Sequence, residues 1–253
     1  MTVASEASHE YDALATVPHL PAALRRRTDL DHATRTVLET VVAGSAVAVA
    51  RALEHQDIET CVSALTHLTD RASVIRRLPW TRWLTEAPDR YAPLATRAAP
   101  SGGLPDIKPT VRRLLTRAPT LPFVALAAEL KDRRSVPCLV DILAQGDPGL
   151  APMVLSALGK IGGVGARETL RRVAEQKELT VARIAVRALS HCAKADDTTV
   201  FLDALRHADW LMRLAALEAL SRLLPTDELG VLIPLMGDPA PIVANRASEL
   251  LLN

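Results

Sequence analysis

The sequence predicts an all-α protein built as a right-handed α-solenoid of antiparallel helix pairs, and three observations support this. The 253 residues are 49% hydrophobic but only 3% aromatic. The hydrophobic residues are mainly Leu, Ala and Val, and Ala and Leu favour helices because they lose little side-chain entropy there. One amphipathic pattern recurs every 31 residues in the C-terminal half. A shorter apolar segment precedes each copy, so the helices come in pairs.

The N-terminus, residues 1–18, is polar and is expected to be disordered or loosely attached. It contains no basic segment followed by an apolar run, which a signal peptide would require. The stretch VVAGSAVAVA at 41–50 is about half as long as a membrane helix needs to be. We therefore expect a cytoplasmic protein without a membrane partner. The three cysteines are far apart and odd in number, which predicts free thiols.

Residues 19–98 are expected to form an N-terminal helical region, either degenerate repeats or a separate cap. The helical patterns cover about 20–27, 31–54 and 57–69, and the candidate N-caps are Asp29 or Asp31 and then Asp57. The segment VSALTH at 62–67 is similar to LSALGK at 155–160, either because it belongs to a degenerate repeat or by accident.

The segment APSGGLPDIKP at 99–109 is the clearest loop of the chain, because it holds three Pro and two Gly. It is a hinge, a domain boundary or a long loop between repeats. Helices are expected to resume at about 109–117 and 121–131.

Residues 110–253 are expected to consist of repeats of about 31 residues. The first helices of the pairs are expected at 135–145, 166–176, 199–208 and 228–237, and the second helices contain GLAPMVLSALGKIG (149–162), TVARIAVRALSHCA (180–193) and LMRLAALEALSRLL (211–224). Equivalent positions of the second helices form apolar columns on one helix face: Leu158, Leu189, Leu220 and Leu251; Val154, Ala185, Ala216 and Ala247; Leu150, Val181, Met212 and Val243; Ala157, Ala188, Ala219 and Leu250. We expect these columns to be buried between neighbouring pairs.

An acidic residue stands at the turn before each second helix. Asp147, Glu178 and Asp209 keep the repeat spacing, and Asp238 is two residues out of step. Asp is a strong N-cap because its carboxylate accepts hydrogen bonds from the free amides of the first turn. The sequence therefore predicts a side-chain cap at these turns, weaker at Glu178.

These units resemble HEAT repeats of the short type found in phycobilin lyase subunits. The family motif is an Asp at the turn and then Val-Arg-x-x-Ala-x-x-Ala-Leu, and MRLAALEAL at 212–220 matches it best, with Asp209 at the turn and Arg213 in the Arg position. Ala151, Ala182 and Ala244 occupy the Arg position of the other units. We therefore do not expect the Asp–Arg ladder of the family. The resemblance implies a fold and does not imply a function.

The second-helix residues expected on the concave side are of mixed character. They are Pro152, Arg183, Leu214 and Asn245 in one row and Ser156, Arg187, Glu218 and Glu249 in the other. Mixed charge suits a protein or peptide partner better than nucleic acid, because specificity then comes from complementarity. The simpler reading is a solvated surface. Our first hypothesis is a scaffold that binds a partner here, with Arg183, Arg187 and Glu218 as candidate binding residues.

A basic segment supports the alternative hypothesis. Residues 71–135 contain 13 basic and five acidic residues, a net charge of +8, whereas the whole chain carries +1. The candidate residues of this segment are Arg76, Arg77, Trp80, Trp83, Arg112 and Arg113. Arginines in one groove would bind phosphates and the tryptophans would stack on bases, unless they are merely surface charges and core residues.

No catalytic motif is recognisable, so enzymatic activity is uncertain and less expected than binding. Alkylpurine glycosylases have a HEAT-like fold that binds DNA, but their active-site Asp flanked by Trp residues cannot be placed in this sequence. Asp209 and Trp210 are the only adjacent pair, and Asp209 is expected to be a cap. An enzyme of this repeat type acting on a protein-bound small molecule stays open. We expect no cofactor and no metal.

Overall fold

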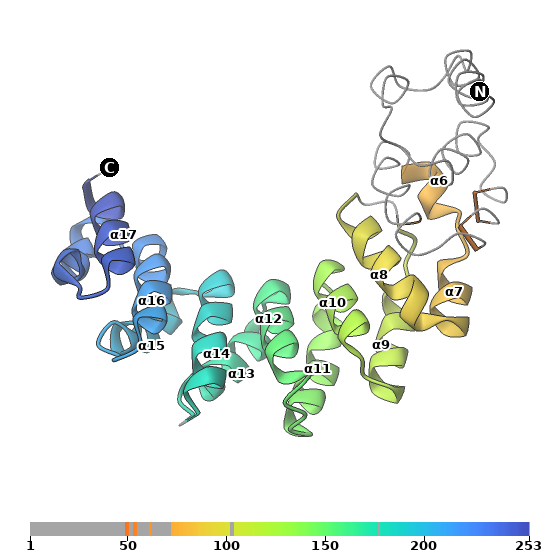
Figure 1. Ribbon diagram of the computed structural model, residues 1–253, viewed down its shortest axis with the longest axis horizontal. Coiled ribbons are helices and arrows are strands. Elements are labelled where there is room, and N and C mark those ends of the chain that lie inside the picture. Colours follow the sequence, from red (N-terminus) through yellow and green to blue (C-terminus); the bar gives the residue numbers. More distant parts are fainter. Residues whose placement is uncertain are drawn as a thin grey trace, which may run out of the picture. The chain divides into compact units, whose positions relative to one another are not determined.

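The computed structural model describes residues 49–50, 53–54, 61, 72–101, 104–176 and 178–252 (Figure 1). These residues form helices and connecting loops without any β-strand, so the all-α prediction is confirmed. Among them, no helix is long and apolar enough to span a bilayer. The predicted features of residues 1–71 (the N-terminal segment, the three helices, the caps and the VSALTH segment) lie outside the described residues, apart from helical positions at Val49, Ala50, Leu53, Glu54 and Cys61.

The chain divides into two compact units, residues 1–107 and residues 108–253, which we call unit 1 and unit 2. The division falls inside the Pro- and Gly-rich segment 99–109. The described helices of unit 1 are α6 (Ala72–Arg76), α7 (Trp80–Glu86), α8 (Pro88–Ala98) and the 3₁₀ turn η2 (Ala99–Ser101). Pro79 precedes α7 and Pro88 opens α8. Proline is favoured at the first position of a helix because it lacks an amide hydrogen, and the amides of the first turn have no hydrogen-bond partner within the helix.

Unit 2 consists of helix pairs placed one after another. The elements are α9 (Lys108–Arg117), α10 (Leu121–Glu129), η3 (Arg133–Ser135), α11 (Val136–Ala144), α12 (Ala151–Ile161), α13 (Val164–Ala174), α14 (Leu179–Cys192), η4 (Ala195–Asp197), α15 (Thr198–Ala204), α16 (Trp210–Leu223), η5 (Thr226–Gly237) and α17 (Pro241–Leu252). The second helices α10, α12, α14, α16 and α17 contact one another in sequence and form what we call the second-helix row (Figure 1). Each also packs on its own first helix, α9, α11, α13, α15 or η5.

The core of unit 2 lies between these helices and uses the columns that the sequence predicts. Leu158, Leu189 and Leu220 are fully buried, and so is the column Val154, Ala185, Ala216 and Ala247. Leu251 is only half-buried, because α17 has a neighbouring second helix on one side only within the described chain. Leu150, Val181 and Leu250 of the other predicted columns are also only half-buried. The periodicity therefore identifies the buried face, with exceptions at these four positions.

Gly159 lets two neighbouring second helices come very close. A Cβ atom built on Gly159 of α12 would lie 2.5 Å from the carbonyl oxygen of Ala188 and 2.9 Å from its Cα, both in α14. The residue is buried in the last turn of α12. Gly162 and Gly163, with φ of 67° and 94°, provide the turn between α12 and α13, where a side chain would strain the backbone.

Some predicted local features differ from the structure. The segment expected as an α-helix at 228–237 is part of the 3₁₀ helix η5, which contains Pro234, a residue with no amide hydrogen to donate within an α-helix. Of the four predicted caps, Asp209 caps its helix through the amides of Leu211 and Met212. Glu178 occupies the N-cap position without a side-chain bond.

The carboxylates of Asp147 and Asp238 accept instead from amides two residues later, at Gly149 and Ala240. They thus close local turns rather than cap the first turn of a helix.

Candidate partner-binding surface

The two candidate tryptophans of unit 1 belong to its core. Trp80 and Trp83 are each 1% exposed, and their indole N–H groups donate to the carbonyl oxygen of Ile75 and to the carboxylate of Glu54 at 2.7 Å. Trp83 stacks on Tyr91, with ring centroids 4.6 Å apart. Base stacking needs an accessible ring face, and in this structure neither tryptophan offers one.

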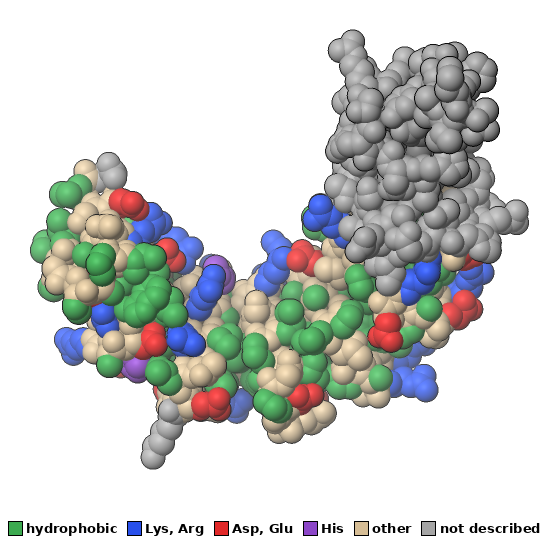
Figure 2. Space-filling model, viewed as in Figure 1, with side chains coloured by type: hydrophobic (Ala, Val, Ile, Leu, Met, Phe, Trp, Pro, Cys, Tyr) green, Lys and Arg blue, Asp and Glu red, His purple; other side chains and the backbone are tan. Residues whose placement is uncertain are grey.

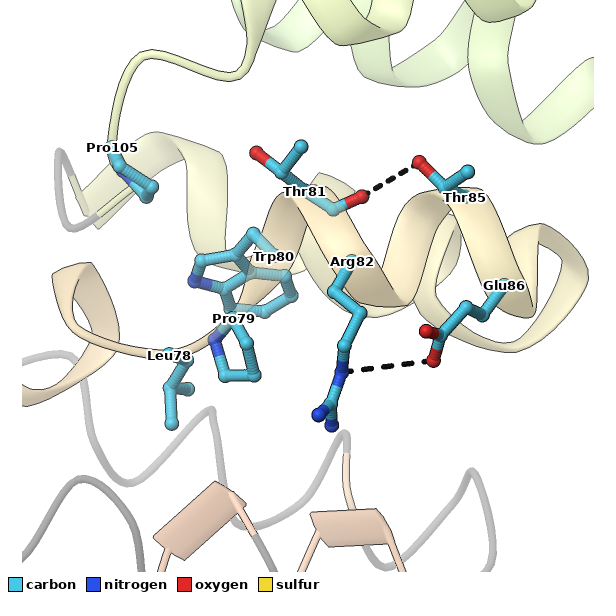
Figure 3. A pocket seen from close by; sticks show the side chains of 8 residues that line it. All are labelled: Leu78, Pro79, Trp80, Thr81, Arg82, Thr85, Glu86 and Pro105. Atoms are coloured by element: carbon cyan, nitrogen blue, oxygen red, sulfur yellow. Dashed lines mark hydrogen bonds and ion pairs between the residues drawn. The ribbon is translucent and has the colours of Figure 1, made fainter.

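A hollow of about 550 Å³ lies beside Trp80 (Figure 3). Its lining residues are Leu78, Pro79, Trp80, Thr81, Arg82, Thr85, Glu86 and Pro105. Arg82 is the only cation among them, and it pairs with Glu86 at 3.6 Å and also with Glu54. Because this charge is already partnered by two carboxylates, the hollow does not form a phosphate site.

The arginines of the basic segment are divided between the two units. Arg76 and Arg77 are exposed at the end of α6 in unit 1. In unit 2, Arg112 pairs with the buried carboxylate of Asp132 at 2.5 Å, whereas Arg113 is exposed.

Burial alone would raise the pKa of Asp132, but hydrogen bonds from Ser135 and Arg112 outweigh it and hold the pKa below its usual value of 3.8. Arg112 thus has a structural role, because it compensates a buried carboxylate.

The second-helix row presents an exposed surface in unit 2, and the residues expected on it are there. Pro152, Ser156, Arg187, Asn245 and Glu249 are exposed, and Arg183, Leu214 and Glu218 are half-buried. Figure 2 shows hydrophobic, basic and acidic side chains side by side on unit 2. The row therefore offers a surface of mixed character and no continuous basic stripe.

The middle of this surface is basic because of one helix. Arg183, Arg187 and His191 follow at four-residue intervals on α14, which places them on one side of the helix; we call them the α14 basic stripe. The whole helix, LTVARIAVRALSHC, contains no acidic residue. Arg183 approaches Asp209 at 3.4 Å, and Arg187 has no carboxylate partner among the described residues.

A cleft of about 500 Å³ lies between the α11–α12 pair and the α13–α14 pair. Its lining residues are Val140, Leu143, Ala144, Gly146, Pro148, Ala151, Pro152, Leu155, Arg172, Val173, Gln176, Glu178, Thr180, Val181 and Ile184. Pro152 is also one of the exposed residues of the second-helix row. The cleft, which we call the α12–α14 cleft, therefore opens next to the α14 basic stripe.

A second cleft, of about 260 Å³, follows one repeat later. Leu143, Leu155, Val173 and Val181 of the α12–α14 cleft each have an equivalent 31 residues further on in this second cleft, namely Ala174, Val186, Ala204 and Met212. The two clefts thus occupy the same place in successive repeats. Sequence reasoning missed them, although their lining positions follow the same 31-residue step as the core.

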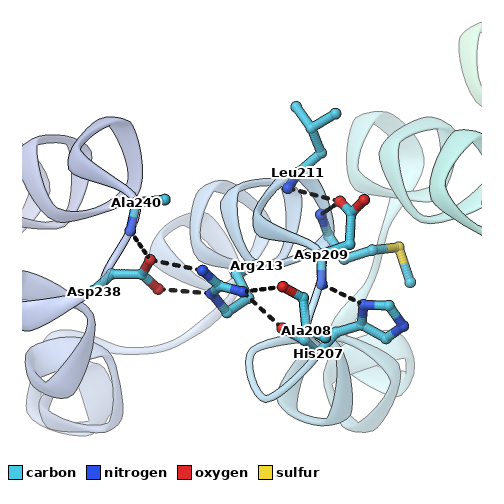
Figure 4. A network of polar contacts seen from close by, with 8 residues as sticks. His207, Ala208, Asp209, Leu211, Arg213, Asp238 and Ala240 are labelled. Carbon is cyan, nitrogen blue, oxygen red and sulfur yellow. Dashed lines mark hydrogen bonds and ion pairs between the residues drawn. The ribbon is translucent and has the colours of Figure 1, made fainter.

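An Asp–Arg network links successive repeats, contrary to the expectation from the sequence (Figure 4). The guanidinium of Arg213 binds both carboxylate oxygens of Asp238 at 2.7 Å and also donates to the backbone carbonyl oxygens of His207 and Ala208. Arg183 makes the preceding link to Asp209 from the position directly after Ala182. The side chain of Arg183 is long enough to reach the next turn from this position. Because the family motif considers only position 182, it did not predict this link.

The ion pair between Arg213 and Asp238 shifts the pKa values of both side chains. The hydrogen bond to Asp238 raises the pKa of Arg213, and the hydrogen bond from Arg213 lowers the pKa of Asp238 below 3.8. Both side chains are largely buried, at 12% and 3% exposure. This pair therefore holds η5 and α17 on α16 and is a structural feature.

No protein-family model matches the chain, and no curated protein matches it. Among the described residues, no group of three His, Cys, Asp or Glu side chains is arranged to hold a metal ion. The candidate site is therefore defined by its own geometry, as a surface of mixed charge with adjoining clefts.

Proposed function

We propose that this chain is a non-enzymatic scaffold of HEAT-like repeats, wound as a right-handed α-solenoid, that binds a protein or peptide through its second-helix row. The exposed rows of α12, α14 and α16, with the clefts beside them, are the observation that carries this proposal. Stacked repeats offer large surfaces with shallow clefts, which suit a polypeptide better than a small substrate.

The charges on this surface also favour a polypeptide partner. Glu129 pairs with Lys160, and Glu218 with Arg246 at 3.6 Å. The row therefore carries both acidic and basic groups, which gives selectivity through complementary charge. A nucleic acid would instead need a continuous series of cations facing its phosphates.

A nucleic-acid partner is the second candidate, supported by exposed arginines in unit 2. Arg113, Arg117, Arg133 and Arg134 are exposed, and none pairs with a carboxylate among the described residues. The buried tryptophans remove the stacking part of this hypothesis. Retention on heparin that falls steeply as salt rises would support it.

Site-specific photocrosslinking in cells that make the protein tests the first candidate. A photoreactive residue at Ser156 lies on the second-helix row, and one at Glu168 lies on α13 in the first-helix layer; both positions are exposed. We expect a discrete protein adduct from position 156 and none from position 168. Equal labelling at both positions, or none at 156, would reject the second-helix row as the binding surface.

A further inference from the structure

The acidic groups around the α14 basic stripe are already matched by cations. Glu129 pairs with Lys160 and Asp209 with Arg183, and Arg246 is shared by Glu218 at 3.6 Å and Glu249 at 2.9 Å. Two other cations of this surface have no carboxylate partner among the described residues: Arg187, and Arg222, whose guanidinium donates to the backbone carbonyl oxygen of Ser190. The surface around α14 therefore keeps an excess of positive charge that the chain itself does not neutralise.

Arg187 lies at the centre of this excess charge. Its neighbours at the same repeat position are Ser156 on α12 and Glu218 on α16, and its neighbours along α14 are Arg183 and His191. Only Glu218 among these is acidic, and Arg246 accompanies it at 3.6 Å. An exposed guanidinium with five donors in this setting is suited to a carboxylate from outside the chain.

The α12–α14 cleft adds an apolar contact at one end of the stripe. Thr180, Val181 and Ile184 line it from the first turns of α14, whereas Arg187 and His191 lie toward the other end of that helix. The two charged residues that line the cleft, Glu178 and Arg172, have opposite signs, and the rest of the lining is mostly apolar. An apolar side chain is therefore favoured in the cleft and acidic side chains further along α14.

We propose that the partner segment is an acidic peptide with an apolar anchor, its anchor in the α12–α14 cleft and its carboxylates on Arg187 of the α14 basic stripe. This inference rests on the proposed function and specifies the chemistry of the partner at the same surface. Charge complementarity sets the acidic part, and the neighbouring cleft sets both the apolar anchor and the direction in which the segment lies.

Fluorescence anisotropy with a designed probe tests the proposal on the full chain. The probe is a fluorescein-labelled peptide with two leucines at one end followed by a run of glutamates, and its matched versions carry Gln for Glu or Ser for Leu. We expect the Glu–Leu peptide to bind, more weakly as salt rises, and each matched version to bind about tenfold less well. No binding of the Glu–Leu peptide, or equal binding of all three, would overturn the proposal.

Protein variants identify the surface that is used. Arg187→Glu should weaken binding of the Glu–Leu peptide about tenfold or more, and Arg187→Lys should retain most of it. Arg206→Glu is the matched control, because Arg206 is exposed just after the first helix α15, outside the second helices, and undergoes the same change of charge. Thr180→Trp should fill the cleft, so it should weaken binding of the Glu–Leu peptide but not binding of the version with Ser in place of Leu. Equal losses for Arg187→Glu and Arg206→Glu would overturn the proposal.

A labelled single-stranded oligothymidylate of similar length is the competing probe. If it binds more tightly than the Glu–Leu peptide and loses affinity with Arg187→Glu, the surface recognises nucleic acid and the proposal is wrong. The crosslinking at position 156 separates the remaining cases. A protein adduct there without binding of the Glu–Leu peptide would refute only the acidic chemistry, whereas the absence of both would refute the scaffold function as well.

Discussion

Gly159→Ala should destabilise the protein although the same exchange stabilises an ordinary helix. In an isolated helix, Ala is favoured over Gly by about 1 kcal/mol. In this structure a Cβ at position 159 would lie 2.5 Å from the Ala188 carbonyl oxygen and 2.9 Å from its carbonyl carbon. These are backbone atoms of α14 and cannot move out of the way as a flexible side chain could. The two helices must therefore separate at their closest contact.

The expected loss of unfolding free energy is the difference between two opposing contributions, the cost of overpacking and the gain in helix propensity. Overpacking a buried site costs about 1–3 kcal/mol, and more where backbone must shift. Because the contact is with backbone, we take the upper end of this range and subtract the gain in helix propensity. The net loss should then be about 2 kcal/mol. For a chain of this size it corresponds to a decrease in Tm of about 4–8 °C.

Urea unfolding followed by circular dichroism measures this change, with Gly165→Ala as the matched control. Gly165 also lies in a helix, α13, but its added Cβ would be 3.6 Å from Val136, an ordinary contact distance. We expect the control to be neutral or slightly stabilised and Gly159→Ala to unfold at lower urea with the same m-value. If Gly159→Ala is as stable as the wild type, α12 and α14 do not approach as described and the packing argument fails.

Three further predictions concern single side chains. Leu189→Ala should cost about 2–5 kcal/mol because Leu189 is fully buried, whereas the exposed Arg187→Ala should change unfolding free energy by less than about 0.5 kcal/mol; equal effects would contradict the assignment of helix faces. Asp238→Asn should cost about 2 kcal/mol at neutral pH, since it removes the charge that compensates the buried Arg213. Because the folded pKa of Asp238 is lowered, its contribution is complete above its usual pKa of about 4 and is lost as pH falls through the folded value, so the difference between variant and wild type should shrink below about pH 4 in urea titrations. Burial raises the pKa of Cys192 to about 11, so only about one thiol in a thousand is ionised at pH 8, and mass spectrometry should show slow alkylation there; rapid labelling of the folded protein would refute the burial.

The fold of unit 2 could be predicted largely from its periodicity, because a buried helix face requires apolar residues at fixed intervals. The column Val154, Ala185, Ala216 and Ala247 is fully buried as expected. Departures occur where a local feature opposes the pattern, as at Pro234, or where a neighbour is missing, as at Leu251. Neither the close approach at Gly159 nor its cost is visible in hydrophobic periodicity, since it depends on the distance between two helices.

The candidate site was only partly predictable. The sequence places Arg187 and Glu218 on the second-helix surface correctly, since exposure follows from helix geometry alone. It does not show that Arg183 and Arg112 bind Asp209 and Asp132 in the folded chain. Such pairs join residues from different helices, and only the packing of those helices decides which arginines remain available to a partner.

The contact at Gly159 also bears on binding, because it sets the shape of the α12–α14 cleft. The two helices touch near their C-terminal ends, at Gly159 and Ala188, whereas the cleft lies near their first turns, at Pro152 and Thr180. From the close contact at one end and the cleft at the other, we infer that the two helices diverge toward their first turns, which leaves the space for an apolar side chain. Gly159→Ala would hold the closed end apart and reduce the divergence. The affinity of the Gly159→Ala variant for the Glu–Leu peptide should therefore fall even where the variant is fully folded. The version with Ser in place of Leu does not use the cleft, so it should bind the variant as tightly as it binds the wild type.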